Sequence, residues 1–191
     1  MGSFYTNITA RTGDLDRVAT AVREVRRTAL IAPPAGGAVV VFDQASEGQD
    51  VEVLKALAAH LSRACACSTI AVMNHDDDVL IYFLYDRGAL KDEYNSAPGY
   101  FDPDGAADDP PSGGDVKRLL SVLGGQGSAA ALDRILHTSA GDDDAFAFAT
   151  DRHRELAVAL GLPEFAAGAG YDYLEAGEIP EGVDVDALVR V

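Results

Sequence analysis

The order of the regular segments in the first 73 residues limits the fold of this chain most strongly. Apolar residues recur either at every second position, as in a half-buried strand, or at the three- and four-residue spacing of an amphipathic helix. Strand patterns cover residues 3–11, 28–32, 38–42 and 69–73, and helix patterns cover 15–25 and 51–61. This order predicts an α+β fold with a ferredoxin-like βαββαβ core and a mostly antiparallel sheet.

The most apolar run in the chain, Val79 to Tyr85, extends this sheet. It is apolar on both sides, which is typical of a central strand or of a sheet that is covered on its second face. The next three residues, Asp86-Arg87-Gly88, have the composition of a tight turn. We therefore expect a β-hairpin at about 79–94.

Helical patterns dominate the second half of the chain. They lie at 116–123, 132–136 and 146–160, and we expect these C-terminal helices to cover the other face of the sheet. The acidic run Asp142-Asp143-Asp144 is expected to cap the last of them. Residues 168–175 carry two tyrosines two positions apart, a pattern that indicates a short strand.

The length of 191 residues suits a single domain with a sizeable core. We expect this domain to consist of three parts. The sheet-forming core spans 1–94, a long acidic loop rich in proline and glycine spans 95–114, and a helical extension with a tail spans 115–191.

The charge of the chain indicates the class of its partners. Acidic residues number 31 against 15 basic ones, a net charge of −16, which disfavours binding to nucleic acid or to an anionic membrane. Such a charge favours a basic protein as partner or metal ions, or it serves only solubility. The chain contains no stretch typical of a membrane span or a signal peptide, so a cytoplasmic location is expected. Cys65 and Cys67 are expected to be reduced thiols.

The segment Asn74-His75-Asp76-Asp77-Asp78 has two interpretations. Imidazole and carboxylate groups together suit a divalent metal, so His75, Asp76, Asp77 and Asp78 are candidate metal ligands. Consecutive residues point in different directions, however, and a charged turn between two strands is the simpler interpretation. We therefore expect no cofactor and keep a divalent metal as the alternative.

Tyrosines and carboxylates occur together in two regions of the second half. Tyrosine supplies contact area at low entropic cost, and carboxylates attract a basic partner, so these regions are candidate binding surfaces. The candidate binding residues are Tyr94, Tyr100, Phe101, Asp102, Asp104, Tyr171, Asp172, Tyr173 and Glu175.

These features favour a small acidic protein-binding module that masks a basic partner surface, for instance an immunity-type inhibitor of a toxin or nuclease. The sequence has no nucleophile elbow, no HExxH helix and no phosphate-binding loop, which weakens an enzymatic role. The alternative is a small-ligand-binding protein or metal-dependent enzyme. It would use His75 or His153 with carboxylates in a pocket between the sheet and the C-terminal helices.

Overall fold

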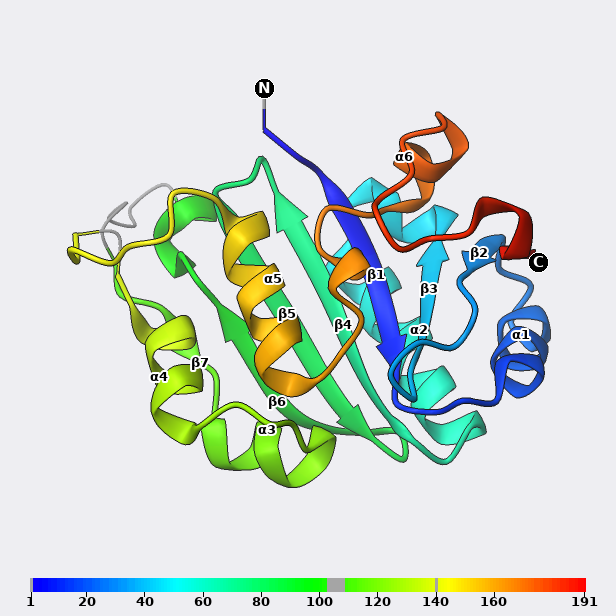
Figure 1. Cartoon of the computed structure of the whole chain (residues 1–191), viewed down its shortest axis with the longest axis horizontal. Coiled ribbons are helices and arrows are strands. Elements are labelled where there is room, and N and C mark those ends of the chain that lie inside the picture. The colour runs from blue at the N-terminus through cyan, green and yellow to red at the C-terminus, as the bar shows by residue number, and fades with distance from the viewer. Residues whose placement is uncertain (1, 103–108, 140) are drawn as a thin grey trace.

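The computed structural model describes residues 2–102, 109–139 and 141–191. Within these ranges the chain forms an eight-stranded, open, antiparallel sheet and six α-helices, so the fold is α+β (Figure 1). The strands are β1 (Tyr5–Ala10), β2 (Ala29–Ile31), β3 (Val39–Asp43), β4 (Ser68–His75), β5 (Val79–Asp86), β6 (Ala89–Asn95), β7 (Ser112–Gly113) and β8 (Val189–Arg190). The helices are α1 (Leu15–Glu24), α2 (Val51–Ala64), α3 (Val116–Leu123), α4 (Ala129–His137), α5 (Ala149–Leu160) and α6 (Tyr171–Glu175).

The strand order of the sheet is β7-β6-β5-β4-β1-β3-β2-β8, and all neighbours are antiparallel. The predicted hairpin is confirmed as β5 and β6, with positive φ at Arg87 and Gly88 in the turn. The sheet is larger than a simple βαββαβ unit because β5, β6 and β7 extend one edge and β8 extends the other. Strand β8 lies in the segment that the sequence indicated only as a tail.

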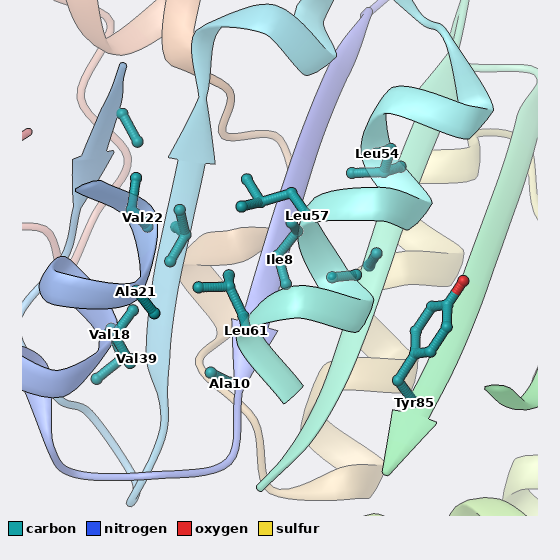
Figure 2. Packing of buried hydrophobic residues seen from close by; sticks show 14 of the residues in the cluster. Ile8, Ala10, Val18, Ala21, Val22, Val39, Leu54, Leu57, Leu61 and Tyr85 are labelled. Atoms are coloured by element: carbon teal, nitrogen blue, oxygen red, sulfur yellow. The ribbon is translucent and has the colours of Figure 1, made fainter. Parts of the chain in front are cut away.

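One face of the sheet is covered by α1 and α2 (Figure 1). Figure 2 shows Leu57 and Leu61 of α2 beside Ile8 of β1, and all three side chains are buried. Burying a side chain of this size stabilises the fold by about 1.5–3 kcal/mol. The helical spacing of the apolar residues in α2 therefore places them on the side of the helix that packs in this core.

The opposite face is covered in two parts. Leu80, Tyr82 and Leu84 of β5 form a cluster with buried residues of α3, α4 and α5, which confirms the predicted role of the C-terminal helices. Over β2 and β3, a separate cluster joins Phe42 with Leu174 of α6. Strand β5 is apolar on both sides because both of its faces are covered. Among the described residues, no helix is long and apolar enough to span a bilayer.

The predicted strand at 168–175 is wrong, because this segment forms α6. Tyr171 and Leu174 are buried, whereas Asp172 and Glu175 are exposed. A spacing of three residues places the buried pair on one side of a helical turn, but on opposite sides of a strand. Burial of this pair therefore decides the local structure.

Gly170, which precedes α6, lies where no side chain fits. A Cβ at this position would be 2.9 Å from Glu47 Oε1 and 2.9 Å from Tyr5 Cβ. We expect Gly170→Ala to lower the free energy of unfolding by about 1 kcal/mol through overpacking, as measured by chemical denaturation. Gly13→Ala is the control, because a Cβ at Gly13 would meet no atom within 4 Å. An equal effect of the two substitutions would contradict this prediction.

Candidate functional site

Residues Asp76 to Asp78 form the turn between β4 and β5, as the simpler interpretation of the sequence predicts. Asp76 and Asp77 have φ values of 52° and 61°, and the Asp78 N–H donates to the His75 carbonyl at 3.1 Å. Aspartate tolerates this left-handed conformation better than most residues do. The turn then directs its three carboxylates to three different segments.

Two of these carboxylates contact segments that carry exposed aromatic rings. Asp76 Oδ1 accepts a hydrogen bond from the Gly2 N–H at 3.1 Å, near the start of the chain. Asp78 Oδ2 accepts from the Tyr100 hydroxyl at 3.4 Å, in the short 3₁₀-helix η2 (Pro98–Phe101). The turn therefore holds the N-terminal segment and η2 at the same end of the sheet.

The third carboxylate, Asp77, caps α5. Its Oδ1 accepts from the Thr150 N–H at 2.8 Å, from the Thr150 hydroxyl at 2.6 Å and from Asn74 Nδ2 at 3.1 Å. Its carbonyl accepts from the Ala149 N–H at 2.7 Å. Burial alone would raise the pKa of Asp77, but the hydrogen bonds from Thr150 and Asn74 outweigh burial and hold it below its ordinary value.

The predicted metal ligands do not converge. His75 Nδ1 lies 3.2 Å from Gln49 Oε1, while the neighbouring carboxylates bind the three segments described above. Throughout the described part of the chain, no group of three or more His, Cys, Asp or Glu side chains is arranged to hold a metal ion. The described residues therefore offer no geometry that supports the metal interpretation.

Aromatic side chains surround His75 instead. The ring centroids of Phe4 and Phe101 each lie 4.9 Å from that of His75, and the Tyr100 centroid lies 5.7 Å away, all in edge-on geometry. Such contacts are favourable but leave ring faces uncovered. Phe4, Tyr100 and Phe101 are 40%, 42% and 51% exposed.

One more exposed ring belongs to the same end of the sheet. Phe148, which is 55% exposed, directly precedes Ala149, whose N–H binds the turn. Every exposed phenylalanine or tyrosine of the described residues is thus attached to this turn by a direct contact or a neighbouring residue. We call this set the turn surface, and it consists of Phe4, His75, Asp76, Asp78, Tyr100, Phe101 and Phe148.

Some of the predicted binding residues are exposed at the turn surface, and others are buried. Tyr100 and Phe101 belong to the turn surface, and the exposed Asp102 follows them directly, whereas Asp104 lies outside the described residues. Tyr94 is only 1% exposed, because the alternation of β6 turns it toward the helices, where its hydroxyl donates to the Leu136 carbonyl at 2.8 Å. Tyr94 therefore cannot contact a partner.

The second predicted region, on α6, is divided in the same way. Tyr171 is buried, whereas Asp172 and Glu175 are exposed and Glu175 pairs with Arg190. Tyr173 accepts a hydrogen bond from the Phe4 N–H at 3.0 Å, which places α6 beside the turn surface. Of the predicted residues on α6, Tyr173 is therefore the one with a described contact to that surface.

A cleft of about 310 Å³ opens beside Tyr100. Asp77 and Asp78 line it at the turn, Asp109 lines it on the loop, and Phe146 and Arg152 are also among its lining residues. Carboxylates outnumber the single cation in this lining. The cleft therefore combines several carboxylates with aromatic residues in its lining.

The alternative pocket, between the sheet and the C-terminal helices, is closed at His153. This side chain is buried, and its Nδ1 lies 2.9 Å from the Tyr5 hydroxyl. Burial, with a smaller effect of the Arg154 charge, lowers the pKa of His153 to about 3, and burial raises that of Tyr5 to about 12. The cavity next to His153 measures about 10 Å³, which admits at most one water molecule. His153 is thus a neutral core residue.

Neither Phe4 nor Phe148 is among the predicted binding residues, because each falls in a predicted regular element, the strand at 3–11 or the helix at 146–160, and not in the two regions where tyrosines and carboxylates occur together. The two residues share one feature: Phe4 directly precedes β1 and Phe148 directly precedes α5, and both elements begin near the turn. No known protein family model matches this chain, and no curated protein and no solved structure matches it.

Proposed function

We propose that this protein is an acidic protein-binding module that masks a basic surface of a partner protein. The observation that carries the proposal is the turn surface, where the exposed aromatic rings lie together with carboxylates. An immunity-type inhibitor of a toxin or nuclease is one protein that would act in this way. Such an inhibitor would meet its partner in the cytoplasm, and neither nucleic acid nor membrane is part of the interaction.

The mechanism we propose is stoichiometric occlusion. Phe101 and Tyr100 have exposed ring area, and aromatic side chains of this kind provide most of the binding energy in many interfaces. Asp78 and the net charge of −16 attract lysine and arginine side chains and steer the encounter. The adjacent cleft takes one basic side chain of the partner.

We also propose that the sheet is a ferredoxin-like core extended at both edges. The support is the order β4-β1-β3-β2 in the middle of the sheet, with α1 and α2 on one face. This arrangement leaves the end of β4 and the start of β1 free to carry the turn surface (Figure 1). The core thus acts as a rigid support for the proposed binding residues.

Capture experiments test the proposed function. The immobilised protein is incubated with lysate of its source cells at about 0.15 M salt, and bound proteins are identified and then purified for affinity measurement. We expect Phe101→Ala to weaken the affinity for the captured basic partner by about tenfold. Leu90→Ala is the matched control, since Leu90 is 45% exposed on β6 but lies outside the turn surface.

Salt dependence supplies the electrostatic part of the test. We expect Asp78→Asn to reduce the salt dependence of binding, whereas Asp16→Asn on the exposed side of α1 leaves it unchanged. If Phe101→Ala and the wild type bound the partner with equal affinity, the turn surface would be excluded as the binding site. Affinity that does not change between low and high salt would exclude the masking of a basic surface.

A further inference from the structure

Arg152, on α5, is a buried cation without a carboxylate partner. Its side chain is 6% exposed, and among the described residues no acidic side chain forms an ion pair with it. Burying a charge without a counter-charge is costly, and arginine keeps its charge at physiological pH. Either the surrounding structure or a ligand must therefore offset this charge.

The contacts of Arg152 offset only part of the charge. Nη1 donates to the Tyr94 hydroxyl and to the Leu136 carbonyl, and Nη2 donates to the Thr138 carbonyl at 2.8 Å. The two carbonyls lie at the C-terminal end of α4, where the helix dipole supplies about half a negative charge. All three acceptors are uncharged groups, so part of the positive charge remains.

One edge of the Arg152 guanidinium is free. Its Nε–H makes no hydrogen bond within the described residues. In the same part of the chain, the fully enclosed side-chain atoms that lack a partner are Asn7 Oδ1 and Asn74 Oδ1, so Nε of Arg152 is not enclosed. The Phe146 ring lies against a face of the group, with its centroid 4.8 Å from Cζ, and this stacking leaves the in-plane donors open. The Nε–H edge is therefore available to a carboxylate.

Arg152 lines the cleft beside Tyr100. The volume of this cleft, about 310 Å³, lies at the lower end of the range of about 300–1,000 Å³ that is usual for small-ligand sites. Ser96 lines the same cleft. Its Oγ accepts from the Leu80 N–H at 2.8 Å, and its own hydroxyl hydrogen has no acceptor among the described residues. The cleft therefore offers two donors to a negatively charged group.

The carboxylates of the cleft disfavour a ligand that is only negative. Asp77, Asp78 and Asp109 also line it, so acidic side chains outnumber Arg152 and would repel a simple anion. A basic side chain alone would pair with these carboxylates but would leave Arg152 without an acceptor. A ligand with one carboxylate and two amines satisfies both signs of charge, and the Tyr100 ring offers its amines a cation–π contact.

We propose that this cleft binds a free amino acid with a basic side chain, of the lysine type. The α-carboxylate of the ligand accepts from Arg152 Nε–H and from the Ser96 hydroxyl. Its two ammonium groups pair with the carboxylates of Asp78 and Asp109. The stack of Arg152 on Phe146 and the bonds of Arg152 to α4 hold the carboxylate-binding group in place before the ligand enters.

This proposal does not rest on the proposed protein-binding function. A basic side chain of a partner would compete with the amino acid for the same carboxylates, but the test below contains no partner protein. Failure of one proposal therefore leaves the other standing.

Titration of the full chain with L-lysine, followed by isothermal titration calorimetry, tests the proposal. Lysine methyl ester lacks the negative charge of the carboxylate, and norleucine lacks the side-chain amine. We expect each of them to bind at least about tenfold more weakly than lysine, because each loses a charge-assisted hydrogen bond. The methyl ester is the sharper probe, since its greater positive charge would strengthen binding if only the carboxylates of the cleft mattered.

Variants locate the binding site. We expect Asp109→Asn to weaken lysine binding by about threefold, whereas Asp16→Asn on the exposed side of α1 leaves it unchanged. Arg152→Met should bring lysine and its methyl ester to equal affinity. This variant also loses its bonds to α4, so the ligand series on the wild type decides the outcome. The proposal is overturned if the wild type does not bind lysine, or if it binds the methyl ester as tightly as lysine.

Discussion

Asp77→Ala is expected to lower the free energy of unfolding by about 3 kcal/mol, the largest effect of any single carboxylate in the turn. The substitution removes the acceptor for the Thr150 N–H, the Thr150 hydroxyl and Asn74 Nδ2. Asn74 is fully buried, so water does not replace the lost acceptor easily. The residue before α5, Phe148, makes no side-chain cap of its own, so the substitution removes the side-chain cap of the helix and leaves only the backbone carbonyl of residue 77 as acceptor for the Ala149 N–H.

Asp76→Ala is the matched control for this experiment. Both positions have positive φ, so both alanine variants bear the same kind of backbone strain, but among the described residues the Asp76 carboxylate accepts only from the Gly2 N–H. Chemical denaturation of the two variants therefore isolates the contribution of the cap. Equal destabilisation by the two substitutions would contradict the capping role.

The pH dependence of the Asp77 effect has a definite sign. The pKa of Asp77 in the folded protein lies below its ordinary value, so its contribution to stability is present above the unfolded pKa and is lost as the pH falls through the folded one. We expect the difference between the wild type and Asp77→Ala to shrink in acid. A difference that grows as the pH falls would require another role for this carboxylate.

The turn at Asp76 to Asp78 shows what the sequence predicts and what it does not. Local composition is enough to predict the turn, because aspartate favours left-handed positions. The partner of Asp77 is Thr150, 73 residues away, and no local pattern connects them. The acidic run Asp142-Asp143-Asp144 is the nearer candidate cap, but α5 begins only at Ala149. The helix is therefore capped from the sheet.

For the aromatic residues as well, the sequence pattern predicts the element but not whether the ring is exposed. Periodicity predicts most strands and helices because it records which side of an element is buried. It does not tell whether an aromatic ring near the end of an element is covered by a distant segment. Tyr94 is covered by α4 and α5, whereas Phe4 is left exposed beside His75. Only the tertiary arrangement separates these two rings.

The capping role of Asp77 also bears on the proposed function. Asp77 fixes the turn that positions Asp78 and His75 for the turn surface. We therefore propose that the inward side of the turn, with Asp77, holds the turn in place and that the exposed side, with Asp78, contacts the partner. Asp78 is exposed, and among the described hydrogen bonds its carboxylate accepts only from Tyr100, so this carboxylate is available to a partner at little structural cost.

The second large effect is expected at Glu47, a mostly buried carboxylate at the end of the sheet near α6. Its Oε1 accepts from the Thr6 N–H at 3.4 Å, the Thr6 hydroxyl at 3.2 Å and the Tyr171 N–H at 3.1 Å. Within the described residues, no cation forms an ion pair with it. Burial outweighs these hydrogen bonds and raises the pKa of Glu47 to about 7.

A raised pKa of an acid means that ionisation opposes folding. The stabilising contribution of protonated Glu47 is complete below its unfolded pKa of 4.5 and is lost as the pH rises through about 7. Glutamine keeps an acceptor oxygen for Thr6 and Tyr171 but never ionises. We therefore expect Glu47→Gln to be about 2 kcal/mol more stable than the wild type at about pH 8, with little difference at about pH 5.

Denaturation at both pH values measures this difference, and the exposed Glu178→Gln is the control for a general change of charge. All other titrating groups are the same in the variant and the wild type. A pH-dependent difference between their free energies of unfolding therefore comes from Glu47 and from Asp172, whose negative charge raises the pKa of Glu47 further. If Glu47→Gln were less stable than the wild type at about pH 8, the three hydrogen bonds to the carboxylate would outweigh its burial. The link between β1 and α6 would then depend on the charged form of Glu47.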